Sequence, residues 1–165
     1  MSHKSLPIAL LMVVVLATIA CAREEDQTIH VNDVDGFMGQ SDVTELTMPN
    51  CESDKELSTT QVIEKVFEHE VKIRANDPDL NEGTLVGELR KYYDEGQPGG
   101  TASTSVVINV PPGSVFVYPI EWTEIWRKGN IVVGSDNRPD ADYEYLKDFQ
   151  GGVLPPRISS CPTTQ

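Results

Sequence analysis

Positive charge is scarce in this chain. Its 165 residues include 13 Lys and Arg against 26 Asp and Glu, for a formal net charge of -13. Nucleic acids and anionic lipid headgroups repel a polyanion of this density. The composition therefore excludes nucleic acid as a partner, and it suits a soluble exported protein.

Apolar runs long enough to cross a bilayer are also lacking. The longest, Leu6 to Ala20, has about 15 residues, whereas a spanning helix needs roughly 20. Lys4 precedes the run and acidic residues 24–26 follow it, which is typical of a secretory signal. We therefore expect residues 1–21 to be a signal peptide and the mature protein to be extracytoplasmic.

Two cleavage patterns fit the end of this signal. Ala20-Cys21-Ala22 matches the small-x-small pattern of an ordinary signal peptidase, which would leave Arg23 as the first residue. Residues 17–21, ATIAC, also resemble a bacterial lipobox in which Cys21 takes a lipid. A diacylated Cys21 would hold the protein on the outer face of a membrane. The protein is thus predicted to be secreted or a cell-surface lipoprotein, with membrane contact only through that lipid.

Cysteine is rare, and this rarity is informative. Of three cysteines, Cys21 belongs to the export signal, so Cys51 and Cys161 remain as a pair. In an oxidising compartment such a pair predicts a disulfide. There is no Cys-x-x-Cys motif, and His30 and His69 are isolated, so we expect no metal site.

Catalytic constellations are missing as well. No Ser-His-Asp or Cys-His set is credible, and no glycine-rich loop could cradle a phosphate. Glu121 and Glu124 are three residues apart on a predicted strand, so they point to opposite faces and cannot share a substrate. We expect neither enzymatic activity nor a cofactor.

The remaining chain divides into three parts. Residues 22–46 are acidic and polar and predict a flexible tether. Residues 47–161 predict a single β-rich domain, which the disulfide would close and which is large enough for one core. Residues 162–165 form a tail.

Local periodicity predicts the elements of this domain. Residues 56–75 fit either a helix or a strand; their Thr, Val, Ile and Phe content favours a strand, but 59–75 stay open between the two. Leu85, Val86 and Leu89 have helical spacing and predict a short helix over 84–95. Residues 129–134 and 142–146 predict two further short strands, and residues 151–157 a final edge segment.

Residues 101–126, TASTSVVINVPPGSVFVYPIEWTEIW, contain two alternating runs around Pro111-Pro112-Gly113. As a three-residue hairpin loop with Gly113 left-handed, this segment would set Val110 opposite Ser114 and Ile108 opposite Phe116. Both strands would then present their apolar residues on one face. The predicted fold is mainly β, either an antiparallel sandwich or an elongated antiparallel sheet, with at most one short helix.

An aromatic row lies on the second of these runs. Tyr118, Trp122 and Trp126 follow one another at steps of about 13 Å in a strand and could form a platform for sugar rings. However, Ile120 shares their face, and a small domain needs such large side chains for its core. A core role is favoured, and the three residues stay the candidate ligand platform.

These motifs together resemble uncharacterised β-rich domains of exported bacterial proteins. The likeness rests on Asn50-Cys51, the Ser/Thr-rich stretch from Ser58 to Val71, Val110-Pro111-Pro112-Gly113, and the segment Tyr118 to Gly129. The Ser/Thr-rich strands also resemble those of aerolysin-type β-pore formers. That second resemblance implies strands that rearrange to form a membrane pore.

Three functions follow as hypotheses. The preferred one is an exported, surface-anchored, non-enzymatic domain with a binding or structural role toward an unknown protein or glycan. The others are a β-pore former and a carbohydrate-binding module. Pore formation requires an amphipathic hairpin without charges on its lipid side. Charged residues crowd the candidate strand and count against it, namely Glu64, Lys65, Glu68, Glu70, Lys72 and Arg74.

Overall fold

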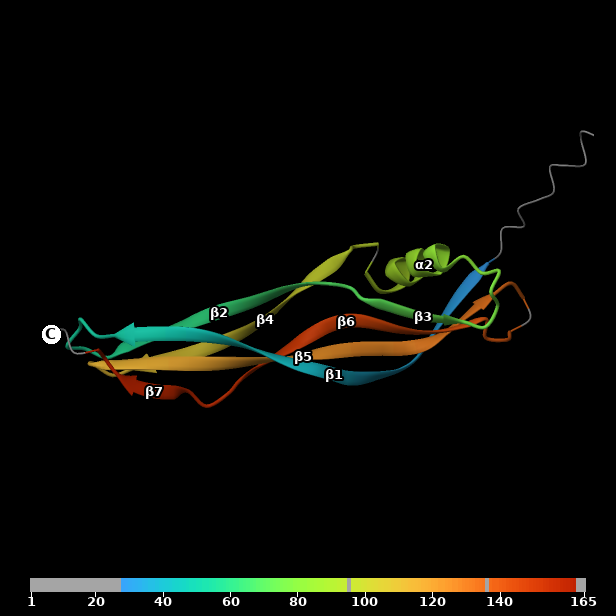
Figure 1. Ribbon diagram of the computed structural model, residues 1–165. Helices are drawn as coiled ribbons and strands as arrows, with labels where there is room; N and C mark the ends of the chain where they lie inside the picture. The colour runs from blue at the N-terminus through green and yellow to red at the C-terminus, as the bar shows by residue number, and fades with distance from the viewer. Residues whose placement is uncertain (1–27, 95, 136, 163–165) are drawn as a thin grey trace, which may run out of the picture.

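The computed structural model describes residues 28–94, 96–135 and 137–162. They form an elongated, mainly β molecule with one helix among the described residues (Figure 1), which confirms the predicted fold class. The elements are β1 (Ile29–Asn50), β2 (Leu57–Glu68), β3 (Val71–Ala75), α2 (Glu82–Asp94), β4 (Gly99–Val110), β5 (Ser114–Val133), β6 (Ala141–Val153) and β7 (Arg157–Ser160). The predicted signal peptide and Cys21 lie outside the described residues.

The strands form one large antiparallel sheet and a separate two-stranded ribbon. In the sheet the order is β1-β5-β6-β3, and the short β7 pairs with the start of β5. The 20-residue β5 is the central strand, with β1 along one side and first β7, then β6, along the other. The ribbon consists of β2 and β4.

Two cores use opposite faces of β5. The ribbon covers Tyr118, Ile120 and Trp122, which are even-numbered. The second core, to which helix α2 contributes Leu85 and Leu89, contains Ile131, which is odd-numbered. Because successive side chains of a strand point to opposite faces, the ribbon and the helix pack on the two faces of one strand.

The Pro111-Pro112-Gly113 segment is not a hairpin, so the predicted register is wrong. Val110 pairs with Leu57, and Ser114 pairs with Asn50 and Ser160, because the chain crosses here from the ribbon into the sheet. The two runs face each other through their side chains across the first core. The alternation of apolar and polar residues shows only that both runs bury one side in the same core. Two strands in stacked layers meet this condition as well as two paired strands of one sheet do. Gly113 is left-handed, with φ at 73°.

The predicted tether over 22–46 needs correction, because residues 29–46 belong to the 22-residue strand β1. This strand pairs with the whole length of β5. Its polar composition arises because its outer edge and much of its surface are exposed. Two register shifts, at Asp33/Asp35 and Met38/Ser41, also break the alternation that would mark a strand.

The other local predictions fare better. Residues 59–75 fall into two strands, β2 and β3, separated by His69 and Glu70. The helix predicted over 84–95 is α2. The two short strands predicted over 129–134 and 142–146 are parts of the longer β5 and β6, and the final segment spans the end of β6 and the approach to β7.

The predicted disulfide is present and closes one end of the molecule. Cys51 and Cys161 have their Cα atoms 5.7 Å apart. The Cys161 amide donates to the Gly113 carbonyl at 3.0 Å, and the Gly113 amide donates to the Asn50 carbonyl at 2.8 Å. The buried Asn50 side chain also donates to the Val110 carbonyl. The bridge therefore holds together the ends of β1, β4 and β7.

Reducing this disulfide should destabilise the fold strongly. The bond closes a loop with a sequence separation of 110 residues, and the loss of such a constraint on the unfolded chain costs up to about 4–5 kcal/mol. We expect the urea midpoint to fall when reductant is added. The Cys51→Ser/Cys161→Ser double variant should start from the lower midpoint and not respond to reductant. An unchanged midpoint in the reduced wild type would contradict this account.

Candidate functional site

The β2–β4 ribbon has one apolar and one polar side. Its strands pair in a continuous register from Leu57 opposite Val110 to Glu68 opposite Gly99. The side toward the sheet consists of Leu57, Thr59, Gln61, Ile63, Lys65 and Phe67 on β2 and Gly100, Ala102, Thr104, Val106, Ile108 and Val110 on β4. The outer side consists of Ser58, Thr60, Val62, Glu64, Val66 and Glu68 with Gly99, Thr101, Ser103, Ser105, Val107 and Asn109. The side toward the sheet is thus the more apolar one, although it includes Thr59, Gln61 and Thr104, and the outer side includes three exposed valines, Val62, Val66 and Val107.

Charges are distributed unevenly between these sides. Strand β2 ends at Glu68, so Glu70 and the two cations of β3 are not part of the ribbon. Glu64 and Glu68 lie on the outer side, which leaves Lys65 as the one charged residue of the ribbon's apolar side. Of the charged residues that counted against an amphipathic hairpin in the sequence, Lys65 alone therefore lies on that side.

Few polar contacts join the ribbon to the sheet. Lys65 Nζ lies 3.0 Å from Asp42 Oδ2 on β1 and 4.8 Å from the centre of the Phe149 ring. The Asn109 amide donates to the Tyr118 hydroxyl at 3.1 Å. The hydrogen bond and positive charge of Lys65 lower the pKa of Asp42. Since no described strand pairs with the outer edge of β2 or β4, the ribbon is held mainly by side-chain burial.

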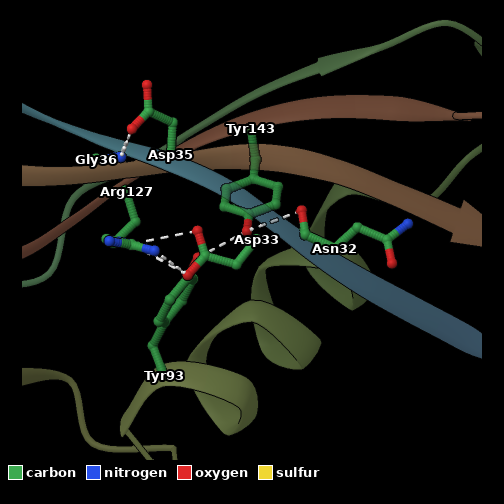
Figure 2. A network of polar contacts seen from close by, with 7 residues as sticks. All are labelled: Asn32, Asp33, Asp35, Gly36, Tyr93, Arg127 and Tyr143. Carbon is green, nitrogen blue, oxygen red and sulfur yellow. Dashed lines mark hydrogen bonds and ion pairs between the residues drawn. The ribbon is translucent and has the colours of Figure 1, made fainter.

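A polar cluster holds the far end of the ribbon in place through α2. Beyond Glu68 the chain forms β3 and α2 before it returns as β4 (Figure 1). The Tyr93 hydroxyl of α2 lies 2.7 Å from the Tyr143 hydroxyl of β6. Beside this pair the guanidinium of Arg127 binds both carboxylate oxygens of Asp33, with Nε 3.2 and 3.1 Å away (Figure 2). The cluster joins α2 to β1, β5 and β6.

Burial and hydrogen bonds determine the protonation states of the tyrosines and the arginine in this cluster. Burial raises the pKa of both Tyr143 and Tyr93, and for Tyr143 the hydrogen bond with Tyr93 acts in the same direction. The hydrogen bond with Asp33 raises the pKa of Arg127. Both hydroxyls therefore stay neutral and one can donate to the other, while the Arg127 guanidinium beside them stays charged.

The predicted aromatic platform lies in the interior. Tyr118, Trp122 and Trp126 are 5, 1 and 3% exposed, so they offer no open surface for a ligand in this structure. Trp126 stacks on Phe37 at a centroid distance of 6.2 Å, and Lys72 Nζ lies 4.0 Å from its ring. The Trp126 indole donates to a Glu124 carboxylate oxygen at 2.8 Å. Core packing, the favoured interpretation of this row, accounts for all three residues.

Among the residues that the structure describes, no three His, Cys, Asp or Glu residues are grouped so that they could hold a metal ion. No helix in the same residues is both long and apolar enough to cross a membrane.

Comparison with known proteins yields two distant structural likenesses. No family model and no curated protein matches the chain. A proposed pore-forming toxin from Bacteroides vulgatus aligns with 84% of this chain at 16% identity and a TM-score of 0.43, and the chain spans 58% of that protein. An aerolysin-like protein from Bombina maxima aligns at 8% identity and a TM-score of 0.36, and the alignment covers 79% of this chain and 97% of that protein. At these scores we draw nothing about function from either likeness.

The tyrosine pair should make stability fall at high pH. The folded-state pKa of Tyr143 is raised, so its contribution is complete below the ordinary tyrosine pKa of about 10 and is lost as pH rises above it. We expect urea unfolding from pH 8 to 11 to show a steeper loss of stability for the wild type than for Tyr143→Phe. Tyr92, which is 53% exposed, supplies the matched control Tyr92→Phe, which should change the slope much less, because Tyr92 makes only a minor contribution to the raised pKa of Tyr143.

The Asp42–Lys65 pair should tie the ribbon to β1 in a pH-dependent manner. Because the pKa of Asp42 is lowered in the fold, its contribution is present above the ordinary aspartate range and lost as pH falls through the folded-state value. We expect Asp42→Asn to speed amide hydrogen exchange in β2 and β4 at neutral pH, with no difference from the wild type at low pH. Glu45→Gln, which breaks the ion pair with Arg157 outside the ribbon, should leave ribbon exchange unchanged.

Proposed function

We propose that this protein is an exported, non-enzymatic β-pore former, in which the β2–β4 ribbons of several copies leave their sheets and line a membrane pore. The observation that carries the proposal is the ribbon itself. It is a continuous amphipathic pair of strands whose apolar side holds a single charge. The ribbon therefore favours a β-pore former over a surface-anchored domain with a binding or structural role.

The ribbon has the length and pattern for this role. Each strand has 12 residues, and a tilted strand crosses a bilayer with about 9–11. The side now packed on the sheet would face lipid, and the Ser/Thr-rich side would face water. Lys65 lies three rungs from the Glu68–Gly99 end, where a long side chain can extend its ammonium to the membrane surface.

Unpaired edges require several copies. Backbone groups exposed to lipid are costly, so each edge of an inserted ribbon must pair with another strand. Strands β2 and β4 are antiparallel, so β2 of one copy can pair with β4 of the next around a closed ring. Membrane-spanning sets of this kind have about eight strands or more, which corresponds to about four or more copies.

Release of the ribbon would start from its far end. The Leu57–Val110 end lies beside the disulfide and the Asn50 contacts, which hold it to the sheet. The Glu68–Gly99 end leads into β3 and α2, so these must separate from the sheet first. Because the ribbon buries its apolar side, it needs another apolar medium to replace the sheet, and the interior of a bilayer provides one.

Dye-loaded vesicles and site-specific probes test the proposal together. We expect micromolar protein to release the dye. An environment-sensitive fluorophore on Thr59→Cys or Gln61→Cys, on the apolar side, should shift to the blue on vesicles. The same fluorophore on the neighbouring Thr60→Cys or Val62→Cys, on the polar side, should not.

The neighbouring positions are matched controls, because only the side of the ribbon differs. Leakage with an alternating shift is the outcome that the proposal requires. No leakage and no shift at any of the four positions would overturn it, and would return the choice to a surface-anchored domain with a binding or structural role. The probed residues lie in the ribbon and not near Cys21. The test therefore applies whether the protein is secreted or carries a lipid on Cys21.

A further inference from the structure

The two outer strands of the large sheet run in opposite directions. In the order β1-β5-β6-β3 every neighbouring pair is antiparallel, so β1 and β3, three steps apart, are antiparallel too. No described strand pairs with the outer edge of either in the region of residues 29–36 and 71–75. Two copies placed side by side in the same orientation would therefore bring β3 of one antiparallel to β1 of the other.

A row of alternating charges crosses this end of the sheet from one edge to the other. Lys72 on β3 is opposite Glu144 on β6, Glu144 is opposite Lys128 on β5, and Lys128 is opposite Asp35 on β1. Lys72 Nζ lies 3.9 Å from Glu144 Oε2 and 3.6 Å from Glu70 Oε1, just before β3, and Lys128 Nζ lies 3.7 Å from Asp35 Oδ2. Over four strands the alternation starts with a cation and ends with an anion.

The adjacent row is also polar, with one oppositely charged pair followed by two asparagines. Arg74 is opposite Asp142, Asp142 is opposite Asn130, and Asn130 is opposite Asn32, whose amide donates to it at 3.0 Å. Along the edges, β3 contains two cations and no acidic residue, whereas β1 contains four acidic residues and no Lys or Arg. The exposed Val34, on the same edge of β1, lines with these rows a groove of about 460 Å³.

We propose that β3 of one copy pairs with β1 of the next, with Lys72 of the first beside Asp35 of the second. The row from Lys72 to Asp35 would then continue across the interface with its alternation of charge unbroken. The inference rests on the proposed function, because it names the surface by which copies assemble, and it describes the assembly before β3 leaves the sheet. Such a head-to-tail contact uses two different surfaces, so a series of them can close into a ring.

Strand pairing and charge have separate roles in this interface. An exposed ion pair alone contributes little and is screened by salt. Addition of a strand to an open edge supplies main-chain hydrogen bonds, and the charges select the partner edge and the register. A contact between the β1 strands of two copies is disfavoured, because their acidic side chains would be adjacent.

Zero-length carbodiimide coupling, applied as the protein meets lipid vesicles and before dye is released, tests the contact while β3 is still in the sheet, using the full chain as a mixture of ¹⁴N- and ¹⁵N-labelled protein. Within one copy Lys72 and Asp35 lie three strand spacings apart, about 14 Å, too far for an amide bond. We expect Lys72–Asp35 peptides that combine both isotopes. The Lys72–Glu144 and Lys128–Asp35 links should carry one isotope only and serve as internal controls. Internal links without any mixed Lys72–Asp35 link would overturn the proposal.

Charge exchange gives a second test. Lys72→Glu alone should lose the mixed-isotope link, whereas Lys91→Glu, on the exposed side of α2, should keep it. A variant with the whole row inverted, Asp35→Lys/Lys72→Glu/Lys128→Glu/Glu144→Lys, restores the alternation. It should form mixed-isotope links between positions 35 and 72 with itself and none with the wild type. Free co-assembly with the wild type would contradict the charge rule.

Leakage measured on uncoupled portions of the same samples separates this inference from the proposed function. Dye release in those portions, with no Lys72–Asp35 link in the portions coupled before release, would overturn the interface and leave pore formation standing. The link without dye release would do the opposite.

Discussion

Burial of one side of the β2–β4 ribbon against β5 is the contact on which the rest of the structure depends. Val106, Ile108 and Val110 are fully buried there, opposite Tyr118 and Trp122. Among the described residues, the two strands of the ribbon pair only with each other. The ribbon can therefore separate from the sheet without losing its own hydrogen bonds, and the free energy at stake is mainly that of apolar burial, which another apolar medium can also provide.

The central strand couples the ribbon to the helix. β5 presents Trp122 to the ribbon and Ile131 to α2, on opposite faces. The chain also connects them, since the far end of the ribbon continues through β3 into α2. Loosening of α2 thus frees the end of the ribbon that is remote from the disulfide, and the Tyr93–Tyr143 pair lies at that junction.

Sequence patterns predicted what local spacing encodes and missed what depends on distant partners. The disulfide follows from having only two cysteines left to pair, and α2 from Leu85 and Leu89 at helical spacing. Alternation identified the buried side of residues 102–122, but it is the same for paired strands and for stacked layers, so the hairpin was wrong. Asp33 and Arg127 are 94 residues apart, and no local signal connects them.

One arrangement of neighbouring copies serves both the sheet and the ribbon. The sheet and the ribbon each have two outer strands that run in opposite directions. When copies are placed side by side around a ring, both the β3–β1 contact and the β2–β4 contact between neighbouring copies are therefore antiparallel. Copies with a formal charge of -13 repel one another in solution, and at physiological salt this repulsion acts only over separations up to about 8–10 Å. Alternating charge at the β3 edge provides local attraction against that background. Assembly by the sheet would then have to come first, because ribbon release removes β3 and leaves Glu144 of β6 at the edge, where it would repel Asp35 of the next copy. The order of events thus follows from which strand lies at the edge.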